Sequence, residues 1–228
     1  MKEPMIVINY KVYESSFGIA ALNIAKAAER VSTDLGVSIV IAPPATEIRW
    51  LAKEVSIPIY AQHADSVELG AYTGHIPLEV IKDAGASGFI ANHSEKRIRI
   101  DEIVKLINKA KALNIKSLIC ADTPEVAAAI SITNPDIIAI EPPELIGTGI
   151  AVSRAKPEII LNTVAKVRSV NKDVMILTGA GISSAEDVAK AIELGTSGVL
   201  VSSAVMKSRQ PDKIILEMAT AALKAFRK

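Results

Sequence analysis

Ile140-Glu-Pro-Pro-Glu-Leu-Ile-Gly-Thr-Gly149 is the stretch around which this 228-residue chain is organised. An apolar run, Asp136-Ile-Ile-Ala-Ile140, leads straight into the carboxylate of Glu141. The two prolines that follow prevent a central strand from continuing, because proline lacks an N–H donor and restricts the residue before it. The stretch therefore predicts a strand that ends at a carboxylate.

The rest of this stretch predicts a loop that closes over a ligand. Leu145 and Ile146 give the loop an apolar tip, and Gly147-Thr-Gly149 gives it wide backbone freedom. A loop of this kind excludes water from a small ligand and delivers Glu141 as a base. An exposed glutamate before a proline-rich turn is the alternative interpretation.

The same order, a short apolar run and then an amphipathic segment, is repeated along the whole chain. The apolar runs are nearly unbroken in Val, Ile, Leu and Ala, which is typical of parallel strands covered on both faces. The predicted strands span residues 5–10, 37–42, 57–62, 87–92, 116–121, 136–141, 173–178 and 197–202. Helical patterns between them include residues 20–35, 101–113, 157–170 and 185–194.

This alternation predicts a closed (βα)8 barrel that occupies residues 1–228 as one domain. An open doubly wound sheet is the alternative. Against it, no Gly-x-Gly-x-x-Gly follows the first strand, where a dinucleotide-binding fold places that motif.

The helix ends are also marked in the sequence. Left-handed caps are predicted at Gly36, Gly85, Asn114 and Gly195. Thr123-Pro124 predicts a helix start, and Ser183 with Glu186 predicts a capping box.

Composition excludes several classes of protein. Hydrophobic residues make up 50% of the chain, yet no apolar run is long enough to span a bilayer. The net charge of +1 gives no reason to expect a nucleic acid or a membrane as partner. The single Cys120 and an N-terminus without a signal-peptide pattern favour a cytoplasmic location.

Polar and small residues gather at the ends of the predicted strands. In a barrel of this type the ligand lies at the carboxyl ends of the strands. The residues at or just past those ends are Asn9, Lys11, His93, Glu141, Gly179, Gly181, Ser202 and Ser203.

Three of these segments, in this order along the chain, carry a family resemblance. Together these segments resemble triosephosphate isomerase: Asn9-Tyr-Lys11, Asn92-His-Ser-Glu95 and the stretch after Ile140. The sequence Pro142-Pro-Glu-Leu145 is similar to that of the archaeal members of this family. The resemblance implies a TIM barrel. It also implies interconversion of dihydroxyacetone phosphate and D-glyceraldehyde 3-phosphate in glycolysis and gluconeogenesis.

The resemblance implies a role for each catalytic residue. Glu141 is expected to move the proton, and His93 to polarise the carbonyl as a neutral imidazole. Lys11 supplies a fixed positive charge and Asn9 helps to position the substrate. Glu95 is similar to the second acidic residue of the family and anchors Lys11.

Further residues are expected to bind the substrate and its phosphate. Glycines let backbone N–H groups approach an anion closely, and a helix start after the eighth strand favours negative charge. The expected binding residues are Asn9, Tyr10, Lys11, Ile146, Gly147, Gly181, Ser202 and Ser203. No metal and no organic cofactor is expected.

Two other groups of residues receive structural interpretations. His63, Asp65, Glu68 and His75 have metal-ligand side chains, but the resemblance places their loop in a partner subunit, so interface polarity is favoured over a metal. Cys120 is interpreted as a small buried hydrophobic residue.

The predicted fifth helix favours an assembly larger than a dimer. Pro124-Glu-Val-Ala-Ala-Ala-Ile-Ser-Ile-Thr133 has one acid and otherwise small or apolar residues with Ser131 and Thr133. An exposed apolar helix marks an association site. With the Gly70–Gly74 loop as the other interface, a homotetramer built as a dimer of dimers is expected; burial of the helix beneath its neighbours is the alternative.

Two rival functions are open at this point. Another phosphate-binding barrel, such as a synthase of tryptophan or histidine biosynthesis, keeps the phosphate loops but does not need Lys11, His93 and Glu141 together. A barrel that only binds a metabolite or other glycolytic proteins has no need of these three residues.

Overall fold

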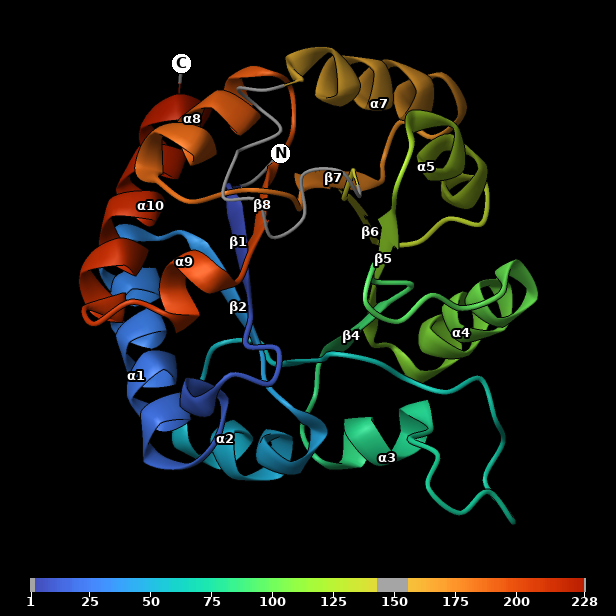
Figure 1. Cartoon of the computed structure of the whole chain (residues 1–228). Helices are drawn as coiled ribbons and strands as arrows, with labels where there is room; N and C mark the ends of the chain where they lie inside the picture. The colour runs from blue at the N-terminus through green and yellow to red at the C-terminus, as the bar shows by residue number, and fades with distance from the viewer. Residues whose placement is uncertain (1–2, 143–155, 228) are drawn as a thin grey trace.

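Short apolar segments form parallel strands at the centre of the molecule, and helices surround them (Figure 1). The computed structural model describes residues 3–142 and 156–227. The strands in these residues are β1 (Met5–Asn9), β2 (Ser38–Ala42), β3 (Tyr60–Ala61), β4 (Gly88–Ala91), β5 (Lys116–Ala121), β6 (Ile137–Ile140), β7 (Met175–Thr178) and β8 (Gly198–Val201).

The helices follow the strands and form an outer ring. They are α1 (Gly18–Leu35), α2 (Ile48–Glu54), α3 (Leu78–Asp83), α4 (Ile100–Leu113), α5 (Pro124–Ser131), α7 (Pro157–Val170), α8 (Ala185–Glu193), α9 (Ser203–Met206) and α10 (Pro211–Phe226). Two short 3-10 turns, η1 (Glu14–Ser16) and η2 (Ala45–Glu47), lie before α1 and α2. In the described residues, no helix has the length and apolar character needed to cross a membrane.

The sheet closes on itself through its two end strands. The strand order is β2-β1-β8-β7-β6-β5-β4-β3, and all neighbouring strands in this order are parallel. A parallel bridge between Ile41 and Ile59 joins β2 to the segment that enters β3, and the Ile41 N–H donates to the Pro58 carbonyl at 3.1 Å. The predicted (βα)8 barrel is therefore confirmed.

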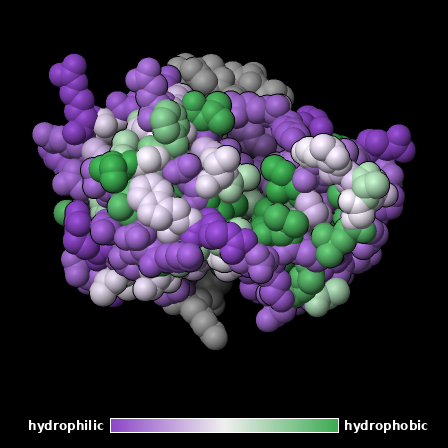
Figure 2. All heavy atoms as spheres, turned by 90° about the horizontal axis from the view of Figure 1, so that it is seen from below, coloured by the Kyte–Doolittle hydropathy of each residue, from purple (hydrophilic) through white to green (hydrophobic). Residues whose placement is uncertain are grey.

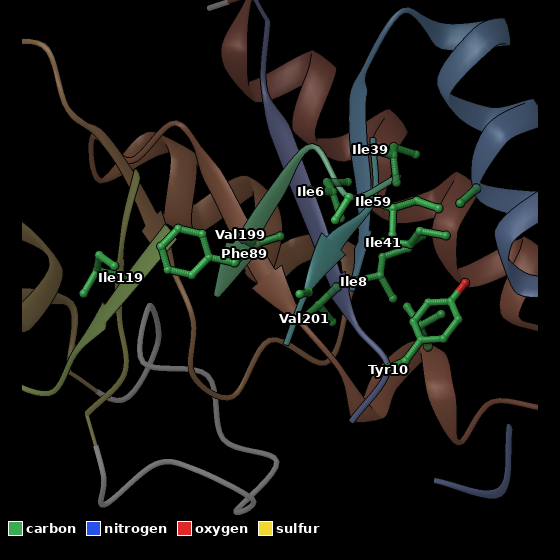
Figure 3. Packing of buried hydrophobic residues seen from close by; sticks show 14 of the residues in the cluster. Ile6, Ile8, Tyr10, Ile39, Ile41, Ile59, Phe89, Ile119, Val199 and Val201 are labelled. Carbon is green, nitrogen blue, oxygen red and sulfur yellow. The ribbon is translucent and has the colours of Figure 1, made fainter. Parts of the chain in front are cut away.

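Alternation along each strand separates two apolar layers. Val7, Ile90 and Leu118 belong to the cluster inside the barrel. Ile6 and Ile8 point the other way, into the larger cluster between strands and helices, as Figure 3 shows for several strands. Both faces of the strands are thus buried, which is why the strands lack the alternating polar pattern of a half-exposed sheet.

Most predicted helix ends are confirmed, and one is wrong. The φ angles of Gly36, Gly85, Asn114 and Gly195 are 66°, 102°, 53° and 100°. The hydroxyl of Thr123 accepts from the Val126 N–H at 3.2 Å, which caps α5. The capping box of α8 uses Ser184 and Asp187 instead of Ser183 and Glu186. The Asp187 carboxylate also accepts from the Ser183 N–H and hydroxyl, so Ser183 belongs to the turn before the helix.

Candidate active site

One pocket collects the carboxyl ends of several strands. It is lined by Asn9, Lys11, His93, Ser94, Glu141, Gly179, Ala180, Gly181, Ile182, Ser183, Leu200, Val201, Ser202 and Ser203. Every residue that was singled out at a predicted strand end is among them. Parallel strands in a barrel end on the same side, so residues far apart in sequence meet there.

Lys11 reaches the pocket through a turn rather than along the strand. β1 ends at Asn9, and Lys11 has a left-handed backbone with φ of 49°. The alternation of side chains along a strand therefore does not set the direction of Lys11. Instead, the Lys11 N–H donates to Oδ1 of Asn9 at 2.9 Å, and Nε2 of Gln62 donates to the Lys11 carbonyl at 2.9 Å.

Gln62 was not recognised from the sequence. It follows β3 directly, and its side-chain amide also donates to the Ala42 carbonyl at 2.9 Å. A left-handed conformation costs a residue such as lysine about 1 kcal/mol. The hydrogen bonds from Asn9 and Gln62 hold Lys11 in that conformation.

The Lys11 ammonium is paired with Glu95. Its Nζ lies 2.7 Å from Oε1 of Glu95, and the side-chain exposures are 18% and 57%. The ammonium therefore lies at the edge of the pocket while its partner faces solvent. Glu95 does not itself line the pocket and contacts it through Lys11.

The hydrogen bonds of His93 define its tautomer. The backbone N–H of Glu95 donates to Nδ1 of His93 at 3.2 Å, so Nδ1 carries no proton. Nε2 lies 3.2 Å from Oε1 of Glu141 and is the nitrogen that carries the proton of the neutral ring. His93 therefore presents an N–H donor to the pocket.

Glu141 is almost completely buried at the end of β6. Its side chain is 2% exposed, and Oε2 accepts from the Ser94 N–H at 3.2 Å. Its backbone N–H donates to the Ala121 carbonyl at 2.7 Å, which continues the strand pairing with β5. The carboxylate is thus bound by His93 and Ser94, both from the turn after β4.

Two neighbours of Glu141 have contacts that the sequence did not indicate. A Cβ atom on Gly179, directly after β7, would lie 2.9 Å from Cγ of Glu141, so a larger residue there would displace the carboxylate. Cys120 is fully buried as expected, and its thiol also interacts with the carboxylate. Burial first, and then the charge of Glu141, raise the pKa of Cys120 well above its usual value, which keeps the thiol protonated.

The opposite side of the pocket is formed by small and hydroxyl residues. Gly181 has a φ of 71°, and α9 begins at Ser203, so the N-terminal end of this short helix lies at the pocket. The hydroxyl oxygens of Ser94 and Ser202 are buried, and neither has a hydrogen-bond partner among the described residues. Helix starts and hydroxyl groups of this kind bind anions.

One expected binding residue, Tyr10, lies away from the pocket. Tyr10 packs its ring in the outer apolar layer, and its hydroxyl donates to the Ala21 carbonyl at 3.4 Å (Figure 3). Ile146 and Gly147, with the rest of the expected lid after Pro142, lie outside the described residues.

The residues with metal-ligand side chains after β3 do not converge. Nε2 of His63 lies 3.1 Å from Asp65, whose other oxygen accepts from the Ile76 N–H at 2.6 Å. Glu68 pairs with Lys109 at 3.3 Å, and the His75 ring packs edge-on against Tyr72. In the part of the chain that the structure describes, no three or more His, Cys, Asp or Glu residues are placed to hold a metal.

Comparison with known proteins places the chain in a family. The family model described as triosephosphate isomerase matches residues 4–221. The chain is 53% identical to a triosephosphate isomerase of Caldivirga maquilingensis, over 96% of this chain and 97% of that protein. It is 48% identical to the triosephosphate isomerase of Saccharolobus solfataricus, over 99% of both chains, and 47% identical to that of Methanothermus fervidus, over 96% and 99%. The chain therefore belongs to the triosephosphate isomerase family.

Proposed function

We propose that this protein interconverts dihydroxyacetone phosphate and D-glyceraldehyde 3-phosphate, with Glu141 as the base. The observation that carries the proposal is the meeting of a buried carboxylate, a neutral imidazole and a lysine ammonium in one pocket of a family member. The two rival functions, a biosynthetic synthase and a barrel that only binds, do not require these three groups together.

Glu141 removes a proton from the carbon beside the substrate carbonyl and returns it to the neighbouring carbon. The electron pair left by the proton moves onto the carbonyl oxygen and gives an enediolate. The proton of the neighbouring hydroxyl is transferred to that oxygen, and reprotonation at the neighbouring carbon then gives the isomeric product. Glu141 is 1% exposed, so its carboxylate is shielded from water where it meets the substrate. To reach substrate, the carboxylate exchanges its contacts with Ser94 and His93 for the carbon-bound proton.

His93 and Lys11 stabilise the negative charge that develops on the substrate oxygens. The Nε2–H of His93 donates a hydrogen bond to the carbonyl oxygen, and the Lys11 ammonium adds a fixed positive charge. Charge that develops in the transition state is best stabilised by groups already in position. The supports of Lys11, from Asn9 and Gln62, and of His93, from the Glu95 N–H, serve that purpose.

The substrate phosphate binds between Gly181 and the start of α9. Ser202 and Ser203 line this side of the pocket, and the buried Ser202 hydroxyl supplies a donor. Ile146 and Gly147 complete the phosphate site when the expected lid closes. The reaction only moves a proton within one molecule, so it requires neither a redox cofactor nor a metal.

The proposed setting is central carbon metabolism, in glycolysis and gluconeogenesis in the cytoplasm. We propose that residues 1–228 work as one catalytic domain. The direct test is a coupled assay on the purified protein with D-glyceraldehyde 3-phosphate and, separately, dihydroxyacetone phosphate as the only substrate. Turnover in both directions supports the proposal, and a protein that binds these sugars without converting them contradicts it.

The proposed assembly is a homotetramer made of two dimers. The loop after β3 supplies one interface, because Leu69 and Tyr72 are 64% and 48% exposed. Figure 2, viewed from below Figure 1, shows hydrophobic residues grouped among hydrophilic ones on the face that carries α2, α3 and this loop. α5 supplies the second interface, because Val126, Ala129 and Ile132 are exposed on it or just beyond its end.

A further inference from the structure

Asn92 lies immediately before His93 and has an unusual backbone conformation. β4 ends at Ala91, and Asn92 follows with a φ of 56°. Residues other than glycine avoid this left-handed region, although asparagine tolerates it better than most. The chain therefore turns sharply between the end of the strand and His93.

Both ends of the Asn92 side-chain amide are bonded to the protein. Nδ2 donates to the Cys120 carbonyl at 2.9 Å, and Oδ1 accepts from the Ile98 N–H at 3.2 Å. The first bond ties the end of β4 to the end of β5. The second closes the turn that contains His93. Asn92 is only 7% exposed, so solvent competes weakly for these bonds.

The backbone of Asn92 is held as well. Nη1 of Arg97 donates to the Asn92 carbonyl at 2.8 Å, and Nη2 of the same guanidinium lies 3.7 Å from Asp122. The turn that begins at Asn92 is thus bound by two side chains, its own and that of Arg97. Glycine at this position would give the same backbone angle but not the two side-chain bonds.

This turn supplies two of the groups that contact the Glu141 carboxylate. His93 contacts one oxygen and the Ser94 N–H donates to the other, each at 3.2 Å. Cys120, whose carbonyl accepts from Asn92, places its thiol against the same carboxylate. A tilt of the turn therefore changes the position of the imidazole and of the carboxylate together.

We infer that Asn92 is a positioning residue for the isomerisation: its clamped left-handed backbone fixes the His93 ring and the Ser94 amide relative to Glu141. This inference rests on the proposed function, because it assigns Asn92 a part in that reaction. Asn92 acts through the turn and does not line the pocket itself.

The chain offers a matched control for the test. Asn92→Gly keeps the left-handed backbone and removes both side-chain bonds. Asn114 is also a left-handed asparagine, with a φ of 53°, but it caps α4 at the end of the barrel away from the pocket. Asn114→Gly therefore reports the general effect of replacing such an asparagine on stability.

We expect Asn92→Gly to lower kcat at least tenfold while KM for glyceraldehyde 3-phosphate changes less than threefold. Nitrogen-15 spectra of the imidazoles give a second reading, and the chain has only three histidines to assign. His93 in the unchanged protein should show one neutral tautomer with its proton on Nε2, and in Asn92→Gly a mixed or broadened signal. Asn114→Gly should change the melting temperature alone.

The inference is overturned if Asn92→Gly keeps kcat within twofold, if its loss is all in KM, or if its His93 spectrum is unchanged. Should Asn92→Gly not fold, Arg97→Gln removes the bond to the Asn92 carbonyl together with the pairing to Asp122, and it leaves both side-chain bonds of Asn92 in place. Arg97→Gln should lower kcat several-fold and broaden the His93 signal. If kcat or the signal stays unchanged, the inference is overturned. If the wild-type protein does not isomerise the substrate, the proposed function is contradicted. The His93 spectra of the wild-type protein and of Asn92→Gly then still test whether Asn92 positions His93.

Discussion

Glu141 depends on a neighbour that has no side chain. Gly179 ends the strand pairing of β7 with β6, and its N–H donates to the Ile140 carbonyl at 2.9 Å. A methyl group there would lie 2.9 Å from Cγ of Glu141 and 3.3 Å from the Ile140 carbonyl oxygen. The backbone oxygen cannot give way easily, so the carboxylate would have to move.

Gly179→Ala should therefore reduce turnover without unfolding the barrel. A displacement of about 1 Å at a reacting group costs up to about a hundredfold, so we expect a loss of about ten- to a hundredfold in kcat. Steady-state kinetics and thermal melting measure the two effects. Gly36→Ala is the control, because Gly36 has a φ of 66° and open space around it. It should lower stability and leave kcat unchanged; equal kcat in both variants would contradict the crowding argument.

At this scale, residue type and strand-end position predicted much of the pocket. Lys11, His93 and Glu141 lie there because each follows an apolar run. Gln62 and Cys120 could not be predicted in the same way. An amide in a loop and a thiol in an apolar strand look ordinary in sequence, and only the register of β3 and β5 against their neighbours brings them to Lys11 and Glu141.

At the scale of secondary-structure elements, the carboxylate of Asp136 fixes the start of β6 to that of β5. Asp136 lies 2.7 Å from the Lys116 ammonium, and its other oxygen accepts from the Ser117 N–H and hydroxyl at 3.0 Å each. Burial opposes the charge, but the bonds from Lys116 and Ser117 together outweigh it and lower the pKa of Asp136. These bonds join the beginnings of β5 and β6, below the pocket.

Asp136→Asn should lower the melting temperature at neutral pH. Weakened bonds to a charged group cost roughly 1.5 kcal/mol, which is about 3–6 °C for a chain of this size. Folding lowers the pKa of Asp136. The ionised side chain therefore adds to the free energy of unfolding at pH values above 3.8, the usual pKa of aspartate, and this contribution is lost as the pH falls below that value.

The difference in melting temperature between Asp136→Asn and the wild-type protein should therefore shrink in melting curves recorded below pH 3.8. Asp83→Asn is the comparison, since Asp83 has an exposed side chain paired with Arg49 on the surface. It should change the melting temperature little at any pH. A constant difference for Asp136→Asn across the acid range would show that its charge does not stabilise β6.

Element positions were predicted closely, and the exceptions have local causes. β3 was expected over residues 57–62 but covers only Tyr60–Ala61. Pro58 has no N–H to donate, so the pairing before Ile59 is limited to its carbonyl. The capping box of α8 lies one residue later than expected, because Asp187 binds two successive N–H groups, those of Ser183 and Ser184.

At the scale of the whole molecule, α5 carries the second interface of the proposed tetramer. Ala127 and Ile130 are buried, whereas Val126 and Ile132 are 37% and 64% exposed. The expected alternative, a helix covered on all sides by its neighbours, does not hold for Val126 and Ile132 within the chain. The alternation of strands and helices indicated the barrel, but only the packed structure shows which face of α5 is open.

Ile132→Lys should convert the proposed tetramer into dimers, because it places a charge within the proposed contact. Light scattering at micromolar concentration gives the mass directly. The control is Leu216→Lys, since Leu216 is 46% exposed on α10, away from α5 in Figure 1. A dimer mass for the unchanged protein, or a tetramer that survives Ile132→Lys, would contradict the proposed interface.

The central claim is that Glu141 moves the proton, and turnover of Glu141→Gln tests it most directly. Glutamine keeps the shape and an oxygen for the Ser94 N–H, but it is not a base. We expect kcat to fall by several orders of magnitude while folding and binding of a phosphate-bearing analogue are preserved. Glu141→Asp should lose about a hundredfold, because its carboxylate is withdrawn by one methylene. Glu217→Gln, an exposed change on α10, should behave as the unchanged protein. Near-normal turnover by Glu141→Gln would remove Glu141 from the mechanism.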